Sequence, residues 1–234
     1  MGAEGDTCYA CNEPATTREH VPPRCLFPES KDLPTGIDLR RNLLTVPSCE
    51  VHNVGKSRDD EYFLWVVCCS LPTNKVGQRQ VYTKLLRALR RDASTWLSFQ
   101  SGARDVIVTE SESGREHEAT MCPFDGARFQ RTLELIARGI YFGHYGEPWH
   151  GALKVHADFV DAPDAPDQAG QRDARLTLFR GAQQIFAAAT WHGANQDVFR
   201  YAVHEPDERF RALVRLAFYG ACTATAFFRS EPQG

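Results

Sequence analysis

Two short pairs of metal-binding residue types constrain the N-terminal part of this chain more than any other feature. Cys8 and Cys11 form a C-x2-C pair, and Cys49 and His52 form a C-x2-H pair. A tetrahedral structural zinc ion binds four such donors, and the two-residue spacer lets both side chains of a pair reach one ion. Residues 1–60 are poor in long apolar runs, and so small a unit needs a staple to fold. We therefore predict a structural zinc ion bound by both pairs.

Composition limits the other uses of the cysteines. The chain has 234 residues, 42% of them hydrophobic, and contains eight cysteines. Its first residues lack the basic start and apolar run of a signal peptide, and no stretch approaches the roughly 20 apolar residues of a membrane span. We expect a soluble, cytoplasmic protein with reduced thiols. Two alternatives stay open: disulfide bonds in a secreted protein, or unrelated thiols beside a surface histidine.

The residues between the two pairs sharpen the interpretation. The segment Glu19–Pro23 (EHVPP) follows the first pair, Asn42–Ser48 (NLLTVPS) leads into the second, and Asn53 follows the last zinc ligand. Over residues 8–60 this layout resembles the zinc-containing HNH endonucleases of the His-Me finger (ββα-metal) group. The resemblance implies a first strand ending at Glu19-His20, a second strand at Leu43–Val46, and a helix starting near Asn53.

The resemblance also implies a role for each matching residue. His20 matches the general base, Glu19 the acidic metal ligand and Asn53 the second ligand of a catalytic Mg2+ or Mn2+ ion. Asn42 matches the asparagine that pins the loop and helps to orient the base. Two residues depart from the pattern, because His52 stands where cysteine is usual and Glu19 where aspartate is common. Zinc accepts imidazole, whereas the longer glutamate would shift the catalytic ion.

The chemistry of phosphodiester cleavage agrees with these residue types. A histidine with an ordinary pKa near 6.5 can take a proton from water near neutral pH. A carboxylate and an amide offer the oxygen ligands that Mg2+ and Mn2+ prefer. We therefore expect a metal-dependent HNH endonuclease that hydrolyses nucleic acid, with DNA as the expected substrate. The alternative is a non-catalytic zinc-knuckle module, nucleic-acid-binding or regulatory, with function in the C-terminal domain.

A nuclease must also hold a polyanion. The formal net charge is −3, so a phosphate-binding surface has to be local. Five basic residues near the predicted site and on a helix after it are the candidates: Lys56, Arg79, Lys84, Arg87 and Arg91. An ordinary solvated amphipathic helix explains the same pattern equally well. We expect a nucleic-acid partner and no membrane partner, and a homodimer stays open.

Residue patterns along the whole chain predict an α+β protein. We expect an HNH finger at 1–60, a helical segment at 61–100 that packs on it, and a C-terminal mixed α+β domain of unknown role at 101–234. Apolar spacing predicts helices at 59–70, 78–92 and 127–143. The region 161–174, rich in Asp, Ala, Pro and Gln, is predicted to be an exposed linker. Strand-like runs are found at 106–108, 119–122, 155–160, 176–179, 185–191, 198–203 and 217–228.

Overall fold

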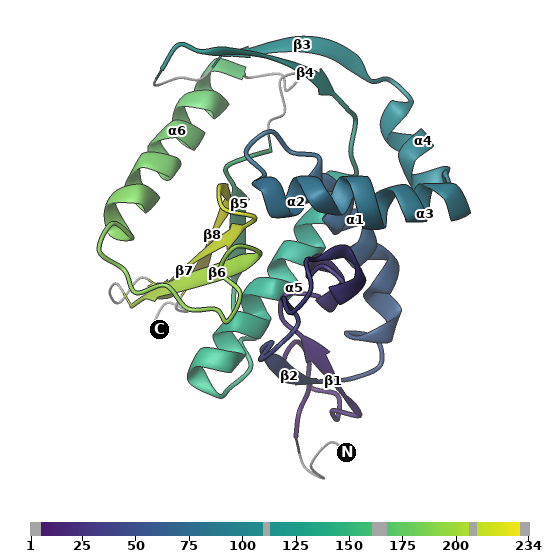
Figure 1. Cartoon of the computed structure of the whole chain (residues 1–234). Helices are drawn as coiled ribbons and strands as arrows, with labels where there is room; N and C mark the ends of the chain where they lie inside the picture. The colour runs from purple at the N-terminus through teal and green to yellow at the C-terminus, as the bar shows by residue number, and fades with distance from the viewer. Residues whose placement is uncertain (1–5, 110–112, 161–167, 206–209, 230–234) are drawn as a thin grey trace.

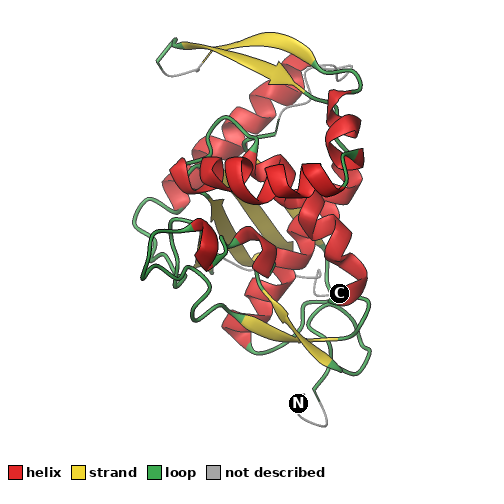
Figure 2. Ribbon diagram, turned by 45° about the vertical axis from the view of Figure 1, so that its right-hand side comes forward, coloured by secondary structure: helices red, strands yellow, loops and turns green. Residues whose placement is uncertain are grey.

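The computed structural model describes residues 6–109, 113–160, 168–205 and 210–229. These residues form a mixed α+β structure, as predicted, and the structure contains six α-helices and three antiparallel sheets within them (Figure 1). Two of the sheets are hairpins at opposite ends of the molecule, and a four-stranded sheet lies between them (Figure 2). Within the described residues, no helix has both the length and the apolar character needed to cross a membrane.

The N-terminal hairpin consists of β1 (Thr17–His20) and β2 (Thr45–Ser48). Its register pairs Thr17 with Ser48 and His20 with Thr45. Strand β1 ends at His20 as predicted, and β2 begins two residues after the predicted start at Leu43. The ladder stops at this point because Pro22, two residues after His20, has no N–H to donate.

The helical segment follows the hairpin directly. A short 3-10 turn, Val54–Lys56, leads into α1 (Ser57–Cys68), two residues before the predicted start. The predicted helix at 78–92 is a longer helical run made of α2 (Lys75–Gln80), a π-helical turn at 81–85 and α3 (Leu86–Arg91). It starts earlier because the Asn74 side chain accepts hydrogen bonds from the N–H groups of Val76 and Gly77, which is an N-cap. Helix α4 (Ser94–Gln100) completes the segment.

A second hairpin and a long helix come next. Strands β3 (Arg104–Thr109) and β4 (Glu116–Met121) match the strands predicted at 106–108 and 119–122. The helix predicted at 127–143 is confirmed as α5 (Gly126–Tyr145). Asp125 caps its first turn by accepting from the N–H of Arg128. Gly146 ends it with a φ of 76°, a left-handed conformation that glycine adopts without strain.

The four-stranded sheet has the order β5-β8-β7-β6. Its strands are β5 (Leu153–Ala157), β6 (Phe199–His204), β7 (Phe210–Phe218) and β8 (Cys222–Arg229). The strands predicted at 155–160 and 198–203 are therefore present with shifted ends. The single run predicted at 217–228 is the end of β7 and most of β8, joined by a turn at Gly220, whose φ is 88°.

Helix α6 (Gln168–Ile185) replaces two of the predicted strands. The strand predicted at 176–179 is wrong because those residues lie within α6, and the strand predicted at 185–191 is wrong because the helix ends there in turns. Phe179, Ala182 and Phe186 recur at helical spacing, and Ala182 and Phe186 are buried. Of the linker predicted at 161–174, residues 161–167 lie outside the described residues, and residues 168–174 begin α6.

One buried core connects the three predicted segments. Phe63 of α1 stacks on Phe129 of α5, with ring centroids 5.2 Å apart, and meets Phe218 of β7 edge-on at 5.2 Å. The core cluster extends from Cys8 in the N-terminal loop to Phe228 in β8. Helix α5 therefore supports the N-terminal hairpin and α1 on the same core as the four-stranded sheet.

Candidate metal centre

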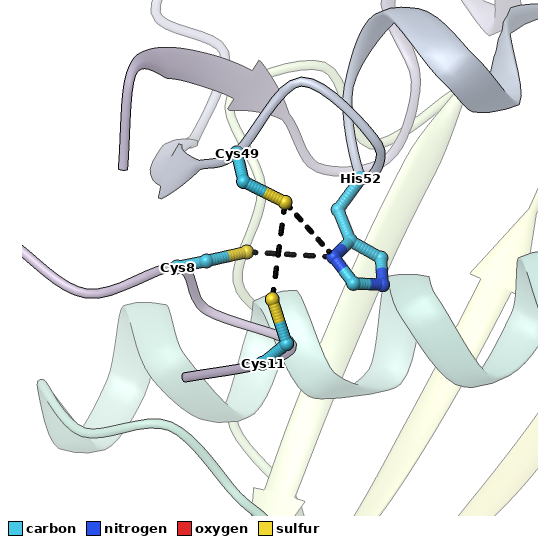
Figure 3. Close-up of side chains that lie close together, drawn as sticks. All are labelled: Cys8, Cys11, Cys49 and His52. Atoms are coloured by element: carbon cyan, nitrogen blue, oxygen red, sulfur yellow. Dashed lines mark hydrogen bonds between the residues drawn. The ribbon is translucent and has the colours of Figure 1, made fainter. Parts of the chain in front are cut away.

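The two cysteine–histidine pairs lie together at one end of the N-terminal hairpin. Cys8 and Cys11 are on a tight turn before β1, held to the end of β2 by the hydrogen bond from Tyr9 N–H to the Pro47 carbonyl, 2.9 Å. Cys49 follows β2 directly, and His52 lies in the turn before α1. The four ligand atoms all lie within 4.8 Å of one another and point to a common centre (Figure 3). We call these four residues the Cys3His cluster.

The spacing of the ligand atoms matches a tetrahedral zinc site. Zinc–sulfur distances of about 2.3 Å and zinc–nitrogen distances of about 2.0–2.1 Å place tetrahedral sulfurs about 3.8 Å apart and a sulfur and a nitrogen about 3.6 Å apart. Cys11 Sγ and Cys49 Sγ are 3.8 Å apart, and Cys8 Sγ is 3.6 Å from His52 Nδ1. The third separation, from Cys49 Sγ to His52 Nδ1, is 3.3 Å. The cluster can therefore hold one metal ion such as zinc.

The surroundings of the cluster lower the pKa of two ligands, Cys8 and His52, whereas burial raises the pKa of Cys11 to about 11. Burial opposes ionisation of Cys8, but backbone hydrogen bonds from Ala10 and Cys49 outweigh it and lower the pKa of this thiol. Burial, Lys56 and Arg138 all lower the pKa of His52 and so favour the neutral imidazole that binds metals. Cys8 is fully buried, and the three cysteines of the cluster are free thiols rather than members of disulfide bonds. Four protein donors leave no open position, which is typical of a structural ion.

A small pocket lies beside the cluster, at the end of β1. Glu19 and His20 line it together with Tyr9, Lys56 and Asp60, and α5 closes its other side. Burial is the largest cause of a lowered pKa at His20, and the charges of nearby arginines add to it. The imidazole is therefore neutral at neutral pH, the state that accepts a proton. This is the state that the predicted general base requires.

The two arginines that act on His20 are Arg24 and Arg40. Arg24 begins a short 3-10 turn after the two prolines that follow β1 and is exposed. Arg40 is half-buried and its Nε donates to the carbonyl of Phe27, 3.0 Å away. Both residues place positive charge near His20, and neither was a candidate site residue from the sequence.

Glu19, the predicted acidic metal ligand, is engaged by a lysine. Lys56 Nζ lies 2.7 Å from Glu19 Oε1 and 2.6 Å from Asp60 Oδ2, and all three side chains are buried. Burial raises the pKa of Glu19 and of Asp60, while the Lys56 charge acts in the opposite direction. Burial lowers the pKa of Lys56, but the two carboxylates outweigh it and raise that pKa above its ordinary value. The three groups form one buried ion-pair network.

The two predicted asparagines have structural positions. Asn53 precedes the 3-10 turn, and its Nδ2 donates to Thr17 Oγ1 at 3.0 Å and to the Arg18 carbonyl at 3.2 Å. It therefore ties the start of the helical segment to β1. Asn42 has a φ of 53° at the turn that leads into β2, a conformation that asparagine tolerates better than most residues.

The residues predicted to hold a catalytic Mg2+ or Mn2+ ion do not fit that ion in this structure. The Glu19 carboxylate is paired with the Lys56 ammonium, and the Asn53 amide is turned to β1. In the described part of the chain, Glu19 belongs to no group of three or more metal-binding side chains close enough to share one ion.

The predicted phosphate-binding residues divide into two groups. Arg79 and Arg91 are exposed on α2 and α3. Lys56 is buried in the ion-pair network, and Lys84 Nζ donates to the Cys25 carbonyl at 2.6 Å. Arg87 is paired with Asp32 through two contacts of 2.7 Å. Tertiary contacts thus hold Lys56, Lys84 and Arg87, and their role in binding phosphate stays a prediction.

Asp60 is the main site residue that sequence reasoning missed. It lies in the first turn of α1, a common place for an acidic residue. Its spacing from Lys56 is i,i+4, the spacing at which opposite charges meet on a helix. That spacing was the available signal, and only the packing of α1 on β1 adds Glu19 to the pair.

The chain was compared with protein-family models, with curated proteins and with solved structures, and none of the three comparisons finds a match.

Proposed function

We propose that residues 8–60 form a zinc-stapled ββα unit of the HNH type and that the protein hydrolyses phosphodiester bonds in nucleic acid, with DNA as the substrate. The observation that carries the proposal is the position of His20 at the end of β1, on the wall of a pocket beside the Cys3His cluster, with a pKa that burial and two arginines lower. The strand–strand–helix order of β1, β2 and α1 also supports it.

The Cys3His cluster would hold zinc as a structural ion. Three thiolates and one imidazole are soft or borderline donors that zinc accepts, and they leave no open position for substrate. The ion supplies folding free energy, because it fastens the loop before β1 to the segment between β2 and α1. That connection determines where His20 lies relative to α1.

In the proposed reaction, the His20 imidazole accepts a proton from the water that attacks phosphorus. As the water oxygen bonds to phosphorus, one ester P–O bond breaks, and the leaving oxygen takes up a proton from solvent. Removing that proton as the water attacks makes the oxygen a stronger nucleophile, and an imidazole is basic enough to do this near neutral pH. Arg24 and Arg40, whose charges act on His20, would bind the phosphate and offset the negative charge that develops on it.

A second function has one specific observation in its favour. The ion pair between Lys56 and Glu19 engages the predicted metal ligand, as expected if the unit binds nucleic acid without cutting it. This alternative is a non-catalytic zinc-knuckle module. It shares the Cys3His cluster with the first proposal but assigns no proton transfer to His20.

A plasmid-nicking assay on the zinc-loaded protein tests both functions. Wild type, His20→Ala and His150→Ala are compared with Mg2+, with Mn2+ and with EDTA, and plasmid binding is measured in parallel. His150 is an exposed histidine outside the pocket, which makes His150→Ala the matched control. Cleavage by wild type and His150→Ala that is lost in His20→Ala supports the nuclease. Binding without cleavage in every metal supports the alternative, and cleavage unchanged in His20→Ala contradicts the role of His20.

A further inference from the structure

The ion-pair network beside His20 is built from two elements that the Cys3His cluster connects. Glu19 comes from β1, while Lys56 and Asp60 come from the 3-10 turn and the first turn of α1. The two carboxylates, which we call the carboxylate pair, meet at a single ammonium group. Lys56 Nζ lies 2.7 Å from one and 2.6 Å from the other.

The burial of this network requires a positive charge between the carboxylates. Glu19 is 7% exposed and Asp60 8% exposed, and two carboxylates at such a site are costly to ionise unless a cation offsets them. Lys56, also 8% exposed, supplies that charge from the chain itself. The place where a cation is needed is therefore already filled.

A second observation identifies this place as a cation site rather than a simple ion pair. The other oxygen of Asp60, Oδ1, is buried and accepts no hydrogen bond from any described residue. One oxygen of the carboxylate pair, Asp60 Oδ1, is thus left as an acceptor that Lys56 does not contact. Its contacts of 2.6–2.7 Å are ammonium–oxygen distances, about 0.5 Å longer than the distance between Mg2+ and its ligands.

We infer that Glu19 and Asp60 form a two-carboxylate cation site whose resident cation is the Lys56 ammonium, so that Lys56 and a divalent ion exclude each other there. The inference rests on the proposed function only for its meaning in cleavage. In cleavage, the positive charge that a metal ion supplies in the HNH endonucleases would come here from Lys56. The wild-type chain then takes no divalent ion at Glu19, and nicking by the zinc-loaded protein needs no added Mg2+ or Mn2+.

Ion binding measured without nucleic acid tests the inference independently of nuclease activity. Zinc-loaded wild type, Lys56→Met and the double variant Lys56→Met/Glu19→Gln are titrated with Mn2+ alone, and bound Mn2+ is followed by electron paramagnetic resonance. Methionine has a similar length to lysine and no charge. We expect Lys56→Met to gain one Mn2+ ion, bound more than about tenfold tighter than any site of wild type that involves Glu19. The double variant should lose that ion again.

A second comparison keeps the inference falsifiable if Lys56→Met does not fold. Wild type and Glu19→Gln are titrated with Mn2+ in the same way, and we expect equal binding because no ion contacts Glu19. Wild-type binding that Glu19→Gln weakens more than about tenfold would overturn the inference, since the ion would then displace the lysine. A folded Lys56→Met that binds no additional Mn2+ would also overturn it. If binding follows the expectation and no variant nicks DNA, only the proposed function fails.

Discussion

Replacing Cys49 by alanine tests the metal centre most directly. Cys49 lies between β2 and the turn that carries His52, and its Sγ faces both Cys11 and His52. A structural ion present at about 1,000 times its Kd adds about 4.1 kcal/mol to the free energy of unfolding. The hairpin that it fastens has only four residue pairs, and a two-stranded hairpin of this kind is marginal alone. We expect Cys49→Ala to lose this contribution together with the zinc.

The loss of the thiol itself adds a smaller amount. Cys49 is 7% exposed, and removing one buried group of that size costs about 1 kcal/mol. The expected total is therefore about 5 kcal/mol, comparable with the whole stability of many domains. The matched control is Cys222→Ala, since Cys222 is fully buried in the same core and lies outside the Cys3His cluster. It should lose about 1–2 kcal/mol and keep the metal.

Urea unfolding followed by circular dichroism, with zinc content measured on each purified variant, checks this prediction. A chelator should lower the stability of wild type and of Cys222→Ala but leave Cys49→Ala unchanged. If Cys49→Ala and Cys222→Ala lose the same free energy and retain the same zinc content, the cluster does not fasten the hairpin.

Two further predictions concern the support of the site. Gly139→Ala should lower the free energy of unfolding by about 1–3 kcal/mol, because an added Cβ would lie 2.6 Å from a methyl group of Val21, next to His20. Gly181→Ala has open space around its added Cβ and should raise the free energy of unfolding by about 0.5–1 kcal/mol. Urea titrations compare the two variants, and equal effects would contradict the packing of Val21 on Gly139. Arg87 lowers the pKa of Asp32, so this pair stabilises the fold above the ordinary pKa of Asp32 and is lost as pH falls through the lower folded value. The free energy of unfolding of Asp32→Asn should therefore decrease less than that of wild type below about pH 4, by up to about 1 kcal/mol. The same decrease in both proteins would argue against the pair.

Local sequence signals predicted the parts of the structure that depend on local chemistry. The two Cys/His pairs required only a short spacer and a common ion, and the structure brings them together. Helix α5 was predictable because its apolar residues recur at helical spacing between a capping residue, Asp125, and Gly146. Strand β1, in contrast, was expected only from the resemblance to the HNH endonucleases, and its end at His20 agrees with that expectation.

The remaining features depend on tertiary contacts that no local pattern encodes. Leu176–Phe179 reads as a strand in isolation, and its helical state reflects the burial of Ala182 and Phe186 further along. Lys84 reads as a solvated charge, but the fold places its ammonium on the Cys25 carbonyl. Such contacts join residues far apart in the chain, and each is decided by packing rather than by propensity.

The two cation positions of the N-terminal unit are physically linked by one short segment. His52 belongs to the Cys3His cluster, and Lys56 follows it by four residues, at the end of the 3-10 turn. Between them, Asn53 fastens the turn to β1 through Thr17 and the Arg18 carbonyl. The register that brings Lys56 to Glu19 therefore depends on the same turn that presents His52 to the metal. An ion in the Cys3His cluster thus stabilises the arrangement in which the lysine neutralises the carboxylate pair beside His20.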